Sequence, residues 1–128
     1  DWAVKQANFE ATRSELIVAG HCGLPFAERR TTLTQNEPTL QWLNPGVIGM
    51  PANDGTRRVW YALLQEADDE IQLQIRSLDY DADTAARHMQ DKPLPPTYAQ
   101  TLLTGLWDNC EILPEVETAR QGRPLSFV

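Results

Sequence analysis

The sequence contains few of the residues that binding and catalytic sites most often use. Among its 128 residues are two cysteines, two histidines and 11 basic residues against 18 acidic ones. Cys22 and Cys110 are far apart and fit no metal-ligand spacing, and two cysteines are too few for a disulfide framework, so we expect reduced thiols. The formal net charge of −7 argues against broad electrostatic binding to nucleic acid or to anionic lipid.

Long apolar segments are also lacking. No run approaches the roughly 18 consecutive apolar residues that a membrane helix needs. The N-terminus lacks the order of basic and then apolar residues that marks a signal peptide. We therefore expect a soluble, cytoplasmic protein without a membrane partner. The chain opens with Asp1 rather than methionine, which is typical of a mature or truncated product, so we expect it to belong to a longer polypeptide.

The length and the hydrophobic content suit a single domain over residues 1–128. Natural domains cluster at roughly 100 to 150 residues, and 41% of these residues are hydrophobic. The apolar patterns predict an α+β fold, with a mostly antiparallel or mixed sheet followed by helices. The predicted strands cover residues 16–19, 26–33, 39–43, 57–64 and 71–76. The predicted helices cover residues 2–14, 82–90 after an Asp81 cap, 96–103 before Gly105, and one turn at 115–120.

The strand patterns also predict partners and surroundings. Turn residues between 26–33 and 39–43, and between 57–64 and 71–76, indicate two hairpins. Residues 57–64 are apolar on both sides, which favours a central strand covered on both faces. Residues 50–56 contain Pro51 and Asn53-Asp54-Gly55, a composition typical of a surface turn.

Residues 16–26 form the stretch most typical of a functional site. The apolar, β-branched residues 16–19 predict a short strand buried on both faces. Gly20 and Gly23 permit a sharp turn, so His21 and Cys22 would lie at the end of this strand, where open sheets place their ligands. A histidine satisfied by backbone hydrogen bonds and a cysteine serving as a small buried hydrophobe explain the same residues.

A second loop, at residues 44–49, has the sequence Asn-Pro-Gly-Val-Ile-Gly. Pro45 forces Asn44 into an extended conformation, and the two glycines, Gly46 and Gly49, let the backbone pass close to another group. This loop is the second candidate for a wall of the site.

The order of these motifs resembles the C-terminal half of calcineurin-like metallophosphoesterases, in the branch of small bacterial and archaeal phosphodiesterases. In that family the corresponding loops read Gly-His-x-His and Asn-Pro-Gly-Ser-x-Gly, followed by a strand containing Tyr-Ala. Here the matching segments are Gly20-His21-Cys22-Gly23, Asn44-Pro45-Gly46-Val47-Ile48-Gly49 and the strand at 57–64. The similarity covers residues 14–81, and residues 82–128 form a helical extension and tail.

The resemblance implies a four-layer αββα sandwich that binds two divalent metal ions (Mn, Fe, Zn or Ni) and hydrolyses phosphate esters with a metal-bound hydroxide. His21 matches a metal-ligating histidine. Cys22 and Gly23, and Asn44 and Gly46, match the loops around the substrate pocket.

The sequence departs from the family in two ways. Gly23 stands where the family has its second histidine, and the N-terminal motifs that supply most of the metal ligands are missing. One imidazole cannot hold a hydrolytic metal, since catalytic zinc sites use three protein ligands. We therefore expect a C-terminal part of the enzyme, inactive alone, whose partner is the missing N-terminal half.

Two other functions fit the same residues. The chain could be a non-catalytic binding or assembly module on a phosphoesterase-derived scaffold, forming a homo-oligomer through the apolar face that the missing half would cover. Alternatively, His21 could activate Cys22 as a nucleophile, although adjacent side chains on a strand-end turn tend to diverge. The other histidine, His88, falls on a predicted surface helix.

Overall fold

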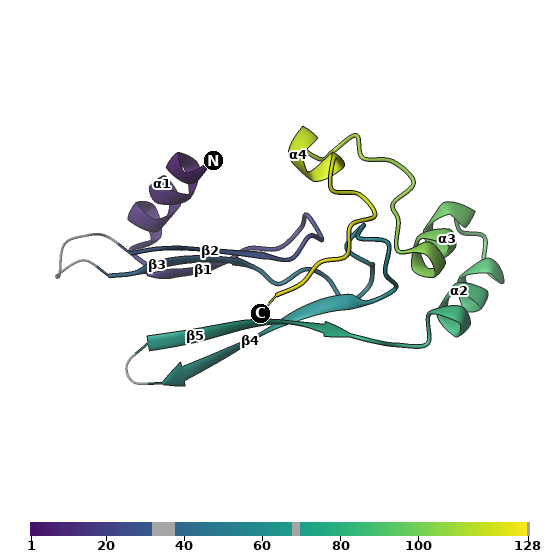
Figure 1. Cartoon of the computed structure of the whole chain (residues 1–128), viewed down its shortest axis with the longest axis horizontal. Coiled ribbons are helices and arrows are strands. Elements are labelled where there is room, and N and C mark those ends of the chain that lie inside the picture. The colour runs from purple at the N-terminus through teal and green to yellow at the C-terminus, as the bar shows by residue number, and fades with distance from the viewer. Residues whose placement is uncertain (32–37, 68–69, 128) are drawn as a thin grey trace.

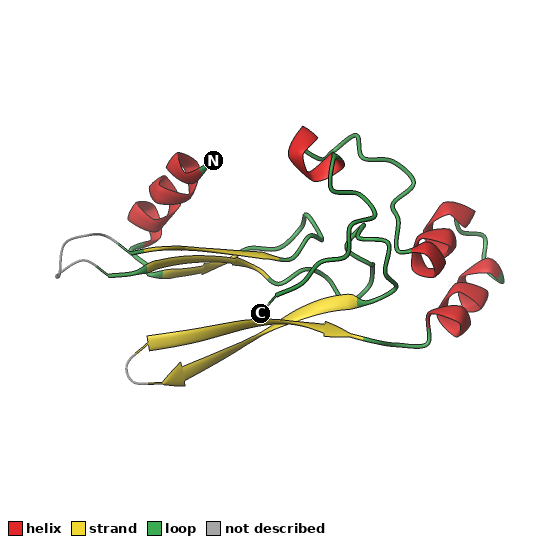
Figure 2. Ribbon diagram, in the orientation of Figure 1, coloured by secondary structure: helices red, strands yellow, loops and turns green. Residues whose placement is uncertain are grey.

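A computed structural model describes residues 1–31, 38–67 and 70–127 of the chain. The helices and strands are α1 (Trp2–Thr12), β1 (Leu16–Val18), β2 (Phe26–Arg30), β3 (Leu40–Asn44), β4 (Val59–Ala67), β5 (Glu70–Leu78), α2 (Ala82–Gln90), α3 (Pro96–Thr104) and α4 (Glu115–Thr118). The predicted α+β fold is confirmed, with small sheets and the later helices following them (Figure 2).

The strands form one three-stranded and one two-stranded sheet. The first has the order β1-β3-β2, with β1 parallel and β2 antiparallel to β3, and the second is the antiparallel pair β4-β5. Both predicted hairpins are therefore confirmed in their strand pairing. Residues 32–37 and 68–69, which belong to the predicted turns, lie outside the described part of the chain.

The three-stranded sheet is covered on both faces. Figure 1 shows α1 on one side of it and the β4-β5 hairpin on the other. On β3, Trp42 meets the ring of Phe9 on α1 edge-on at a centroid distance of 6.0 Å. The next residue, Leu43, faces the opposite way and is buried with Trp60 and Ile75 from the hairpin. Successive side chains of a strand point to opposite faces of the sheet. The side chains of β3 therefore pack on α1 from one face and on the hairpin from the other, which gives the layer order α, β, β.

The predicted burial of two strands is wrong. Val18 of β1 is 52% exposed, and β1 lies at an edge of its sheet within the described residues. Strand β4 is not central, because it belongs to the two-stranded sheet, and its Leu63 and Leu64 are 42% and 46% exposed. Continuous apolar residues normally indicate cover on both faces. The described chain supplies that cover on one face of the β4-β5 hairpin.

The helices after the sheets agree with the sequence patterns. Asp81 caps α2 by accepting a hydrogen bond from the Thr84 backbone N–H at 2.9 Å. Hydrogen bonding from the Thr84 side chain and then from its backbone lowers the pKa of Asp81. Helix α3 ends at Gly105 in a left-handed conformation, and α2 packs on α3 through Ala86 and Leu102. Within the described ranges, no helix has the length and apolar character needed to cross a bilayer.

The prediction of a surface turn at residues 50–56 is wrong. The four residues Pro51, Ala52, Asn53 and Asp54 are buried. The Asn53 side-chain oxygen accepts hydrogen bonds from the Trp107 backbone N–H at 2.8 Å and from the Gln121 amide at 3.1 Å.

Asp54 makes a second set of contacts in the same segment. Its carboxylate accepts hydrogen bonds from the backbone N–H groups of Thr56 at 2.9 Å and Leu125 at 3.0 Å. The polar residues that favour turns bind backbone N–H groups here. They attach the C-terminal segment to the loop that follows β3.

Candidate functional site

The two loops singled out from the sequence lie together. Because β1 and β3 are parallel neighbours, the residues that follow them meet at the same edge of the sheet. The Asn44 side-chain amide donates a hydrogen bond to the Cys22 sulfur at 2.8 Å, and the Gly46 backbone N–H donates one to the Asn44 side-chain oxygen at 3.0 Å. Asn44 itself is 2% exposed. A buried amide therefore fixes one loop against the other.

His21 has an exposed side chain and an unfavourable backbone conformation. Its φ is 81°, in the left-handed region that favours glycine. Its ring makes no hydrogen bond within the described ranges, so the interpretation of a histidine satisfied by the backbone does not apply to the imidazole. Strained backbone of this kind concentrates at functional sites. His88 is also exposed but lies on regular helix in α2.

One glycine in each loop, Gly23 and Gly46, adopts a positive φ. Gly46 has a φ of 80°, and a Cβ atom there would stand 2.9 Å from the Trp60 Cβ. Gly23 has a φ of 71°, and a Cβ atom there would lie 3.4 Å from the Trp107 ring and 3.5 Å from the Met50 methyl group. Gly23 is the position where the family resemblance places a second histidine. In this chain Trp107 and Met50 fill the space beside it.

A cavity of about 600 Å³ opens beside His21 and Cys22. Its other walls come from the loop after β3, from α2 and α3, and from residues 107–112. The lining residues are His21, Cys22, Met50, Met89, Leu94, Pro95, Thr97, Tyr98, Thr101, Trp107, Asp108, Asn109 and Ile112. The sequence did not reveal these distant walls, because nothing in the local pattern of α2 and α3 indicates which loop they face.

These residues do not by themselves form a metal centre. Within residues 1–31, 38–67 and 70–127, no group of three or more histidine, cysteine, aspartate or glutamate side chains could hold a metal ion. The lining residues of these types are His21, Cys22 and Asp108, which are not placed to hold one metal ion together. The Cys22 sulfur also accepts the Asn44 hydrogen bond. The described residues alone therefore offer no complete ligand set for the metal ions that the resemblance implies.

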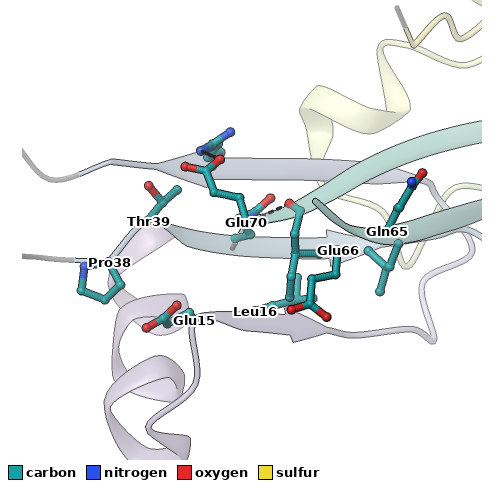
Figure 3. Close-up of a pocket in the computed structure, with 11 residues that line it drawn as sticks. Glu15, Leu16, Pro38, Thr39, Gln65, Glu66 and Glu70 are labelled. Atoms are coloured by element: carbon teal, nitrogen blue, oxygen red, sulfur yellow. Dashed lines mark hydrogen bonds and ion pairs between the residues drawn. The ribbon is translucent and has the colours of Figure 1, made fainter. Parts of the chain in front are cut away.

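A larger cavity, of about 720 Å³, lies at the other end of the strands. Figure 3 shows Glu15 and Thr39, which precede β1 and β3, near Glu66 and Glu70 at the closed end of the β4-β5 hairpin. This is the edge opposite His21 and Asn44. Because ligands bind at the carboxyl ends of parallel strands in open sheets, the cavity beside His21 is the better candidate site.

Comparison with known proteins supports the fold. The sequence matches no protein-family model, and no curated protein matches it significantly. The structure superposes on the crystal structure of a metallophosphoesterase from Sphaerobacter thermophilus with a TM-score of 0.63 and 23% sequence identity. The match covers 80% of this chain and 48% of that one, so the chain spans about half the length of that protein. The chain therefore adopts part of a metallophosphoesterase fold.

Proposed function

We propose that this chain is the C-terminal part of a metal-dependent phosphoesterase, in the branch of small calcineurin-like phosphodiesterases, and that it is inactive alone. The observation that carries the proposal is the meeting of the His21 and Asn44 loops at one edge of the sheet. The fold shared with a metallophosphoesterase supports it. The substrate class is a phosphate ester.

Each loop residue has a role in the proposed site. His21 presents an exposed imidazole at the cavity and would serve as one ligand of a divalent metal. Asn44 holds the Cys22 sulfur, while Gly46 gives the second loop its close approach to Trp60. The remaining ligands, and hence the metal ions (Mn, Fe, Zn or Ni), depend on other polypeptide. No step of hydrolysis is assigned to this chain alone.

The proposed partner is an N-terminal half that completes the sandwich. Strand β1 lies at an edge of its sheet within the described residues, and such an edge accepts a further strand. The exposed apolar side chains of Val18, Leu63 and Leu64 support a surface that another segment covers. We further propose a cytoplasmic location, which the free thiols of Cys22 and Cys110 support.

A binding or assembly module is the second candidate function. It is favoured by the filled space beside Gly23 and by the absence of a three-ligand group in the described ranges. Such a module would bind protein through the same exposed apolar residues and would form a homo-oligomer. It would hold no metal.

The test uses the product of the complete reading frame that encodes this chain. With added Mn²⁺, we expect hydrolysis of bis-p-nitrophenyl phosphate. His21→Ala should lower the rate at least about 100-fold, because loss of a metal ligand should cost no less than loss of a residue that supports one. His88→Ala removes the exposed histidine of α2 and should leave the rate unchanged. Equal rates in the two variants would contradict the role of His21, and absence of metal-dependent hydrolysis would favour the module.

A further inference from the structure

The cavity beside His21 has an apolar wall that phosphate binding does not require. The apolar residues that line it beside His21 and Cys22 are Met50, Met89, Leu94, Trp107 and Ile112. Its volume of about 600 Å³ lies within the range of roughly 300 to 1,000 Å³ that is usual for small-molecule sites. The space is therefore large enough for an organic group next to the imidazole.

The aromatic part of this wall is fixed before any ligand binds. The Trp107 indole N–H donates a hydrogen bond to the Pro51 carbonyl at 2.8 Å, and the Trp107 backbone N–H donates to Asn53. The Tyr98 hydroxyl donates a hydrogen bond to the Gly49 carbonyl at 3.1 Å. Both rings are anchored to the loop that follows β3. A ligand that packs on them loses little free energy to the ordering of side chains.

The charges of the lining select against a second anion. Asp108 is the acidic residue of the wall, and the lining residues include no lysine or arginine. The rest of the wall therefore suits a neutral apolar group.

We propose that this cavity binds the alcohol portion of the phosphate ester, and that this portion is neutral and largely apolar, an aryl or alkyl group of small-molecule size. This inference rests on the proposed function for the phosphate that accompanies it. The helical extension at residues 82–112 then selects the substrate, while the loops after β1 and β3 belong to the reacting centre.

The test measures binding of 1-naphthol, a neutral aryl alcohol, to the 128-residue chain by calorimetric titration without metal. We expect saturable binding that Leu94→Asp and Ile112→Asp each weaken at least tenfold, because each places a carboxylate in the apolar wall. These side chains are 49% and 82% exposed, so neither substitution disturbs the core. Val116→Asp is the matched control, since Val116 is 58% exposed and does not line the cavity.

The outcomes separate this inference from the proposed function. No saturable binding, or equal weakening by the control, would overturn the inference and leave the His21 assay unaffected. A second outcome is that both wall variants lose 1-naphthol binding while the complete product hydrolyses no phosphate ester. That outcome would support the apolar ligand class and contradict the proposed phosphoesterase activity. Inorganic phosphate should not displace bound 1-naphthol when both are present, because the two probes occupy different parts of the site.

Discussion

At the scale of single residues, His21 combines exposure with a backbone conformation that suits glycine. Its φ of 81° is unfavourable for a side chain with a Cβ atom. The ring gains no hydrogen bond from the described residues in return. A residue kept in such a position at the mouth of a cavity is better explained by what its imidazole binds than by its contribution to folding.

This strain predicts that His21→Gly stabilises the chain. The free energy of unfolding, measured by urea titration, should rise by about 0.5–1 kcal/mol, because glycine adopts a positive φ at little cost. His88→Gly is the control, and it should lower the free energy of unfolding by about 1 kcal/mol because residue 88 lies within helix α2. A loss of stability in His21→Gly would show that the imidazole is held by contacts.

Asp54 is the residue whose importance the local sequence conceals. Composition places it in a surface turn, yet its side chain is buried and accepts hydrogen bonds from Thr56 and Leu125. Its partner Arg58 stands at 3.3 Å. The contact with Leu125 spans 71 positions of the chain. No local pattern could indicate this contact. The contact between Cys22 and Asn44, by comparison, follows from two adjacent parallel strands.

Two aspartates that pair with arginines should respond differently to the same substitution. Asp54→Asn should lower the free energy of unfolding by about 2 kcal/mol, because a buried acceptor of charged and backbone donors is replaced by an amide. Asp83 pairs with Arg57 at the shorter distance of 2.9 Å, but both side chains are half exposed or more. Asp83→Asn should therefore cost no more than about 1 kcal/mol. Chemical denaturation of both variants checks the prediction, which equal losses would contradict.

At the scale of elements, the sequence predicts the pieces better than their surroundings. The Asp81 cap, the Pro96 start and the Gly105 end are local signals, and α2 and α3 have these boundaries to within a residue. The exposed faces of β1 and β4 were not predictable in this way. An apolar pattern indicates a strand that is covered on both faces, whereas the described chain leaves parts of these two strands exposed. The walls that α2 and α3 add to the site depend on tertiary packing.

The end of α3 packs closely against the segment before β4. A Cβ atom at Gly105 would stand far inside contact distance of the Thr56 backbone, and its φ is 71°. Gly105→Ala should therefore lower the free energy of unfolding by more than about 2 kcal/mol, through the left-handed conformation and the displaced segment 53–56. Gly20→Ala meets nothing within 4 Å and should change stability little. Thermal unfolding of the two variants distinguishes them, and a tolerated alanine at 105 would contradict this packing.

At the scale of the whole molecule, the described chain has an α, β, β order of layers. Helix α1, the three-stranded sheet and the β4-β5 hairpin follow one another (Figure 1). Strand β4 of the hairpin carries the exposed leucines Leu63 and Leu64. The structural match spans 48% of the Sphaerobacter thermophilus protein. These observations support the proposal made above, that His21 belongs to a metal site whose remaining ligands lie on other polypeptide.

The direct test of this account is the rate of Mn²⁺-dependent hydrolysis of bis-p-nitrophenyl phosphate, measured for the 128-residue chain and for the product of the complete reading frame. The account predicts a rate for the complete product that a chelator abolishes, and a background rate for the chain alone. Rapid metal-dependent hydrolysis by the 128-residue chain would contradict it, as would the absence of hydrolysis in both proteins.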